Sequence, residues 1–152
     1  MSDFFYAYRS ISHRELVTLL TSNNPIYGSE VWGKINPCEC SCTLPFGTVC
    51  FWETPIFWRD KEHEIDIVCR FAEDRPESQH GTGTWNVPKS FAKTNIYTGR
   101  EGSVITDLPE FYTRFYTVND VESIHMRLRY SDHHRKQLRE LAEKQGIWFY
   151  DN

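Results

Sequence analysis

Hydrophobic periodicity divides the first part of the chain into a strand and a helix. Aromatic and β-branched residues fill residues 4–11, which predicts a strand. Leucines then recur at helical spacing, and Ser12 with Glu15 makes the capping box that begins a helix. Pro25 disfavours a helical residue before it, so we expect this helix to end a few residues earlier.

The rest of the chain reads as further strands and one closing helix. A helix capped by Ser131 or Asp132 is expected to run to about Gln145, with Gly146 after its end. The pattern predicts strands at 48–54, 65–71, 108–118, 123–130 and 147–150, a loop at 37–47, and a polar, mobile connection at 72–84.

This order of elements predicts one α+β domain over residues 1–152. There is no regular alternation of strands and helices, which argues against a doubly wound parallel sheet. A mostly antiparallel, split sheet with flanking helices fits better.

Composition restricts the location and the partners. The net charge of −4 argues against tight nonspecific binding to nucleic acid, although a local basic groove stays open. The N-terminus lacks the basic start and apolar run of a signal peptide, and no apolar stretch is long enough to span a bilayer. Five cysteines cannot all pair internally, so we expect free thiols in a reducing, cytoplasmic compartment and no membrane partner.

Two charged residues stand out on predicted strands. Arg9 lies near the end of the first strand, where its guanidinium could hold a pyrophosphate or ribose, or could pair with a nearby carboxylate at the surface. Glu110 is flanked by apolar residues, and its carboxylate could stabilise an oxocarbenium-like sugar. The alternative for Glu110 is an edge-strand side chain facing water.

Cysteine, histidine and basic clusters give weaker indications. Alternating thiols at Cys38, Cys40 and Cys42, with His63, could form a zinc site, but the spacing is too close for most zinc sites and free thiols fit better. His133 and His134 point in different directions on a helix, so they do not form a paired metal grip. The basic residues could face a polynucleotide or simply water; they are Arg127, Arg129, Arg135, Lys136 and Arg139.

Several short segments together resemble the ADP-ribosyltransferase fold superfamily. Residues 5–13, running into a Leu-rich helix, resemble the opening strand that binds NAD, and residues 49–55 are similar to the aromatic strand that ends in Thr-Pro. Residues 109–112 resemble the strand that carries the catalytic Glu. The order and the aromatic ending at 146–150 look most like DarT-type DNA ADP-ribosyltransferase toxins.

The resemblance implies a mono-ADP-ribosyltransferase that uses NAD as a substrate and needs no metal. Arg9 would bind NAD, with Ser12 and Thr54 as further contacts, and Tyr27 would stack on nicotinamide. Glu110 and Arg9 would be the catalytic residues. The acceptor could be a protein or a nucleic acid, as for a toxin, an effector or a phage-encoded modifier. DarT-type proteins usually have Arg after Thr-Pro, but this chain has Ile56, which argues against DNA as the acceptor.

Two hypotheses of other classes stay open. One is a non-catalytic protein that binds a host protein through exposed aromatic residues. The other is a nucleic-acid-binding or nuclease module that uses the basic cluster, whose binding would weaken steeply with salt. Convergence of Arg9 and Glu110 in one cleft would favour the enzyme. If the two side chains point to separate faces, the hypothesis of an enzyme that uses both residues fails.

Overall fold

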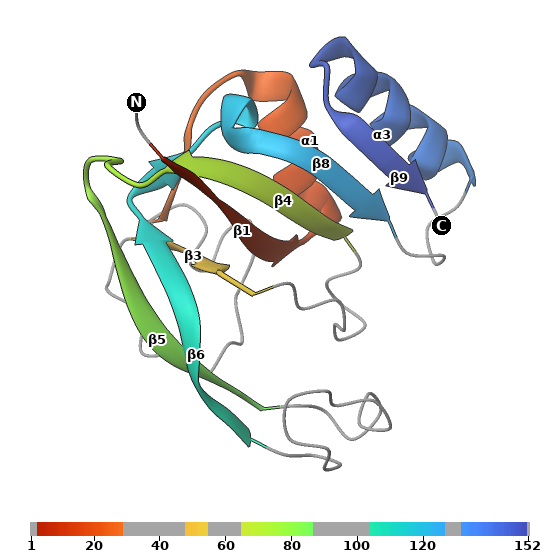
Figure 1. Ribbon diagram of the computed structural model, residues 1–152. Helices are drawn as coiled ribbons and strands as arrows, with labels where there is room; N and C mark the ends of the chain where they lie inside the picture. Colours follow the sequence, from red (N-terminus) through yellow and green to blue (C-terminus); the bar gives the residue numbers. More distant parts are fainter. Residues whose placement is uncertain (1–2, 29–47, 55–64, 87–103, 127–131, 152) are drawn as a thin grey trace.

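The computed structural model describes residues 3–28, 48–54, 65–86, 104–126 and 132–151 (Figure 1). Its helices are α1 (His13–Ser22) and α3 (Asp132–Lys144), with a short 3-10 helix, η3 (Val118–Asp120). The strands are β1 (Phe4–Ile11), β2 (Ile26–Tyr27), β3 (Val49–Trp52), β4 (Ile65–Ala72), β5 (Ser78–Asn86), β6 (Val104–Thr113), β7 (Phe115–Tyr116), β8 (Val121–Met126) and β9 (Trp148–Asp151).

Seven strands form the main sheet in the order β5-β6-β3-β1-β4-β8-β9, and β2 and β7 form a small second sheet. All pairs are antiparallel except β8 with β9, which are parallel and lie on either side of α3 along the chain. The prediction of an α+β fold with a mostly antiparallel sheet is therefore confirmed.

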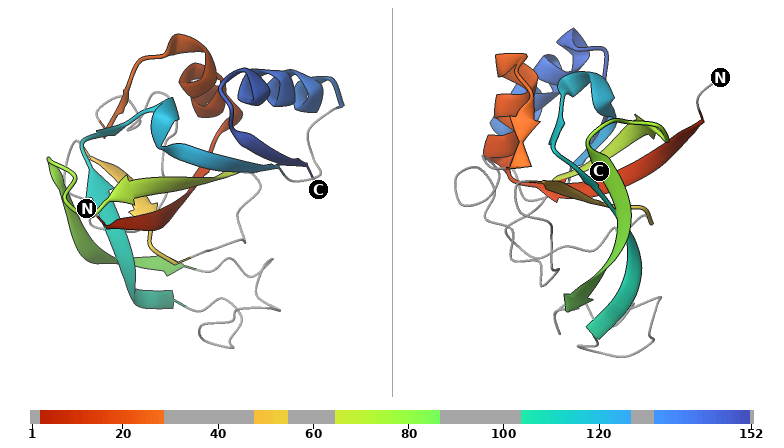
Figure 2. Two further views of the ribbon diagram at one scale, coloured as in Figure 1. Left: turned by 45° about the horizontal axis from the view of Figure 1, so that its top comes forward. Right: turned by 90° about the vertical axis from the view of Figure 1, so that its left-hand side faces the viewer.

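Both helices cover the same face of the sheet, and β5 and β6 curve away from them as a long ribbon (Figures 1 and 2). Side chains alternate along β1, so Ala7 and Ile11 point into the core beneath the helices. The helices complete this core with Leu16 and Leu19 of α1 and Leu138 of α3, all fully buried. Among the described residues, no helix lies on the opposite face of β1, β4, β8 and β9, and we call this the open face.

Capping residues set the helix ends where the sequence places them. The Ser12 hydroxyl accepts a hydrogen bond from the Glu15 amide, as predicted for the start of α1. The other half of the predicted capping box is wrong, because the Glu15 carboxylate binds Arg9 and Tyr116 instead of turning back to Ser12. Asn23 ends α1 in the left-handed conformation at φ 57°, and Gly146 follows α3 at φ 72°. Only glycine, and less readily asparagine, adopts this conformation at low cost.

The prediction that residues 72–84 form a mobile connection is wrong for most of the segment. It contains the end of β4, a turn and most of β5, which pairs with β6 from Ser78 to Asn86. The side chain of Arg75 holds the turn by donating to the Thr113 hydroxyl and the Phe115 carbonyl. Because β5 is a polar edge strand held by main-chain bonds to β6, its hydrophobic pattern is weak.

Two other predicted boundaries change, and one lies outside the described residues. The predicted strand 108–118 is interrupted at Arg114, so it becomes part of β6, then β7 and the start of η3. The predicted strand 123–130 begins earlier, at Val121. The predicted loop 37–47 lies outside the described residues.

Candidate functional site

The main sheet is narrowest between β1 and β3. In the described residues, Tyr8 and Trp52 are the one pair in register between these two strands, whereas β1 pairs with β4 along its whole length. Two parts, β5-β6-β3 and β1-β4-β8-β9, therefore meet at a narrow junction. Trp52 is in register with Glu110 of β6, so Tyr8, Trp52 and Glu110 form one row across the junction, on the face away from the helices.

Glu110 is a fully buried carboxylate at this junction. It lies on β6 between β5 and β3, so the alternative of an edge-strand Glu facing water is wrong. Its Oε2 accepts a hydrogen bond from the Cys50 thiol, at 2.6 Å between sulfur and oxygen. Since burying a carboxylate is costly unless it is hydrogen-bonded, this contact helps to hold Glu110 in the interior.

Gly81 leaves room for the Tyr112 ring near Glu110. It is in register with Glu110 on β5, and a Cβ atom on it would lie 2.6 Å from the Tyr112 ring. The Tyr112 hydroxyl donates to the Thr82 carbonyl. The missing side chain at Gly81 therefore lets the ring cross toward β5.

Arg9 lies on the opposite face of the sheet, beneath α1. Its Nε and Nη2 atoms donate to both carboxylate oxygens of Glu15, each at 3.0 Å, and its Nη1 donates to the Cys50 carbonyl. The Tyr116 hydroxyl donates to the same Glu15 carboxylate at 2.7 Å. Arg9 is 5% exposed and Glu15 is fully buried, so water does not screen this ion pair.

The Glu15 carboxylate, together with burial, sets the protonation states of Arg9 and Tyr116. Burial alone lowers the pKa of Arg9, but the Glu15 carboxylate overcomes this effect and leaves the pKa raised. Burial also raises the pKa of the Tyr116 hydroxyl, and the charge of Glu15 raises it further. Arg9 therefore remains charged and Tyr116 remains a neutral donor across the physiological range.

Arg9 and Glu110 are not brought into one cleft. Both contact Cys50, but Arg9 binds its backbone carbonyl and Glu110 accepts from its thiol, so the two side chains are on different faces. The structure therefore contradicts the expectation that Arg9 and Glu110 converge in one cleft. The alternative prediction for Arg9 was a surface ion pair. Arg9 does pair with a carboxylate, but the pair is buried in the interior.

The other predicted NAD contacts are spread over the molecule. The Ser12 hydroxyl caps α1. Tyr27 is 38% exposed and lies in the small sheet, with its ring 5.6 Å from that of Phe115. Thr54 is partly buried two residues after β3. The structure places none of these three in the row that contains Glu110.

Trp52 lies in the aromatic segment 49–55 that the resemblance singled out, but neither Trp52 nor Tyr8 was predicted to share a face with Glu110. Strand alternation from Glu110 through the register would have pointed to Trp52 and Tyr8 instead of Arg9, but the register needs the tertiary structure. Farther along the open face, the Ser10 hydroxyl donates to Asp66 at 2.7 Å. Burial raises the pKa of Tyr8, and the charge of nearby Glu122 adds to this.

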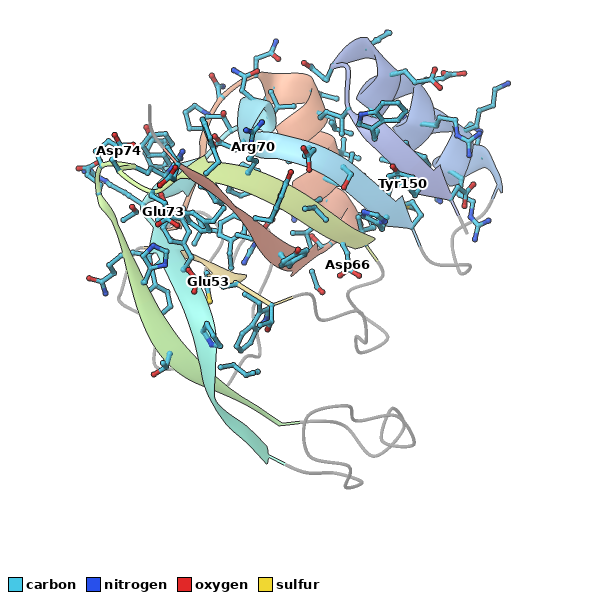
Figure 3. All side chains as sticks on the ribbon, viewed as in Figure 1. Glu53, Asp66, Arg70, Glu73, Asp74 and Tyr150 are labelled. Atoms are coloured by element: carbon cyan, nitrogen blue, oxygen red, sulfur yellow. The ribbon has the colours of Figure 1, made fainter. Side chains whose placement is uncertain are left out.

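A second polar cluster, also missed, links β5 to the ends of two other strands. The ring nitrogens of His80 contact Glu53, just after β3, and Glu73, just after β4. The His80 ring packs against Phe5 and Phe111. Figure 3 shows Glu53 and Glu73 beside β6. This cluster ties the curved ribbon to the rest of the sheet.

The structure describes only part of the candidate metal and basic clusters. Cys38, Cys40, Cys42 and His63 lie outside the described residues. In the part of the chain that the structure describes, no three His, Cys, Asp or Glu side chains gather as metal ligands would. Cys50 and Cys69 are buried and form no disulfide, and burial raises the pKa of the Cys69 thiol. Arg135, Lys136 and Arg139 are described on α3, but Arg127 and Arg129 are not.

No protein-family profile, curated protein or solved structure matches this chain. None of the helices in the described residues is long and apolar enough to cross a membrane.

Proposed function

We propose that the chain is an NAD-dependent ADP-ribosyltransferase in which Glu110 alone is the catalytic carboxylate. Because Arg9 lies on the other face of the sheet, the proposal does not include the convergence of Arg9 and Glu110 that was predicted from the sequence. The supporting observation is the position of Glu110, a buried carboxylate at the narrow junction of the sheet and on the face away from the helices. The likeness of residues 109–112 to the strand that carries the catalytic Glu supports the same assignment.

The chemistry requires a carboxylate where positive charge develops. The bond between the ribose C1′ and the nicotinamide nitrogen breaks, and its electron pair leaves with nicotinamide. The ribose then carries oxocarbenium character, which a nearby carboxylate stabilises. A nucleophilic atom of the acceptor bonds to C1′ and loses its proton. The acceptor in this proposal is a protein or a nucleic acid.

The remaining roles follow from the faces of the sheet. Tyr8 and Trp52 share the row with Glu110 and offer aromatic surfaces for a planar ring, in place of Tyr27. Arg9 acts from the other face by fixing β1 to α1 through Glu15. Because Glu110 is fully buried, NAD can reach it only after the side chains that cover it move aside.

The test is NAD cleavage by the native protein, Glu110→Gln and Glu122→Gln. Glu122 is an exposed glutamate on β8, so its variant controls for loss of one negative charge. We expect nicotinamide release, and transfer of labelled ADP-ribose to lysate, to fall about 100- to 1,000-fold in Glu110→Gln alone. Absence of release from the native protein, or equal release from a folded Glu110→Gln protein, would overturn the proposal.

A second candidate function, a non-catalytic protein-binding module, is favoured by the open face. Four of the exposed large apolar side chains lie on it, namely Phe4, Tyr6, Trp148 and Tyr150. Figure 3 shows Asp66, Arg70 and Tyr150 on β4 and β9 of this face. With exposed Glu122 nearby and a chain charge of −4, the face fits a basic protein segment, whose cations bind aromatic rings and carboxylates.

Substitution on the open face tests this candidate. Binding of a Lys- and Arg-rich peptide is expected to weaken at least about tenfold in Tyr6→Ser with Trp148→Ser, and to be unchanged in Tyr27→Ser. Tyr27 is the matched control because its ring is exposed on the other, two-stranded sheet. Equal affinity of all three proteins would exclude the open face as the binding surface.

A further inference from the structure

A hollow between α3 and β9 gathers positive charge at one place. It has a volume of about 170 Å³ and is lined by Arg135, Lys136 and Arg139 of α3 and by Asp151 of β9. The three cations outnumber the one carboxylate, so the lining carries an excess of two positive charges. This contrasts with the chain as a whole, which carries a net charge of −4.

The carboxylate orients the two guanidinium groups. Asp151 is bound by Arg135 at 3.2 Å and by Arg139 at 3.4 Å, through different carboxylate oxygens. Arg135 and Arg139 are one helical turn apart, so they project from the same side of α3. Arg139 also lies over the Phe149 ring, 5.5 Å from its centroid, which further restricts its side chain.

Restricted arginines bind anions better than freely moving ones. A guanidinium has five N–H donors in a fixed fork, and Asp151 takes one bond from Arg139. Lys136 adds an exposed ammonium to the lining. Because ordering a long side chain costs conformational entropy, a cation already held by Asp151 loses less on binding.

We propose that this hollow is a binding site for a phosphate group. The excess of two positive charges matches the charge of a phosphate dianion, and the forked donors of arginine suit its tetrahedral oxygens. The site is independent of Glu110, because it lies at the β9 end of the sheet beneath α3. The proposal gives Arg135, Lys136 and Arg139 a shared role in binding phosphate. From the sequence alone, these residues could face either a polynucleotide or water.

The test is titration of the folded protein with inorganic phosphate and, separately, with adenosine monophosphate. Amide resonances of α3 and β9 are followed by NMR at constant ionic strength, with chloride as the control anion. We expect saturable shifts with a Kd of about 1 mM, and about tenfold weaker binding in Lys136→Gln and in Arg139→Gln. Lys144→Gln, an exposed change in the last turn of α3, should bind like the native protein.

The two phosphates distinguish the source of the group. Tighter binding of adenosine monophosphate would identify an organic phosphate as the ligand, and equal binding would identify the free anion; either result supports the site. Shifts that do not saturate, that chloride reproduces, or that persist in both Lys136→Gln and Arg139→Gln would overturn it. Those variants change exposed side chains, so folding can be checked by their unchanged β-sheet resonances.

Discussion

At the scale of single residues, the buried charge of Arg9 has a structural role. Arg9 has the residue type and position of a ligand-binding arginine, yet its donors are taken by Glu15 and a backbone carbonyl. The sequence could predict the cap at Ser12, since a cap is local. It could not predict that Tyr116, 101 residues after Glu15, donates to the same carboxylate. Long-range partners of this kind follow from the fold.

Removing Arg9 should therefore cost stability. Arg9→Met leaves the buried Glu15 carboxylate without its cation, and we expect the free energy of unfolding to fall by about 3–5 kcal/mol in urea denaturation. The double variant Arg9→Met, Glu15→Leu removes both charges and should recover much of this loss. A fall below about 1 kcal/mol in the single variant would contradict a strong buried pair.

The contact of Cys50 with Glu110 makes a separate prediction. Cys50→Ala removes the thiol donor and should lower the free energy of unfolding by about 1.5–3 kcal/mol, because the acceptor is a buried carboxylate. Cys50→Ser keeps a donor at that position and should lose less. If both variants lose the same amount, packing of the sulfur and not its hydrogen bond is what matters.

At the scale of elements, strands buried on one face were predictable and the polar edge strand was not. β1 and β4 carry apolar residues at alternate positions, so their bounds were nearly correct. β5 consists largely of Ser, Gln, His, Gly and Thr, and its extended conformation depends on pairing with β6. Register and partner choice depend on both strands, and one strand's sequence holds only half of that information.

The close packing of the Tyr112 ring against Gly81 can be tested directly. Gly81→Ala would place a Cβ 2.6 Å from the Tyr112 ring, and we expect about 1–3 kcal/mol of destabilisation from overpacking. Gly146→Ala meets no atom within 4 Å but has φ 72°, so its cost should be about 1 kcal/mol of backbone strain. Thermal unfolding would measure both, and a larger loss at Gly146 would contradict the crowding at Gly81.

The contact between α1 and α3 predicts a pH effect. Burial lowers the pKa of His13, and the charge of His134, whose ring lies 5.2 Å away, lowers it further. Because the folded pKa is below the unfolded value of about 6.5, His13 reduces stability as pH falls through that value and has no effect well above it. His134→Gln should raise the pKa of His13, as measured by NMR titration. An unchanged pKa would exclude the electrostatic coupling.

At the scale of the whole molecule, the order of strands in the sheet limits how much of the site the sequence could predict. Strands far apart in the chain lie side by side, with β6 between β5 and β3, and β1 between β3 and β4. The class of fold follows from the order of elements, so it was predictable. The face on which each charge lies follows from the pairing, which explains why Glu110 was found but the position of Tyr8 and Trp52 beside it was not.

The narrow junction predicts uneven stability and a response to NAD. β1 and β4 pair along eight positions beneath the helices, whereas β1 and β3 share one. We therefore expect the amides of β1 and β4 to exchange hydrogen only on global unfolding, and those of β3 and β6 to exchange through a smaller opening.

If NAD enters at the junction, saturating NAD should slow exchange in β3 and β6 and leave β9, at the far edge of the sheet, unchanged. This measurement needs no turnover, so it separates binding at the junction from catalysis by Glu110. Equal exchange in all strands without NAD would contradict the opening. Identical exchange of β3 and β6 with and without NAD would place NAD elsewhere or exclude its binding, whatever the substitution at Glu110 does.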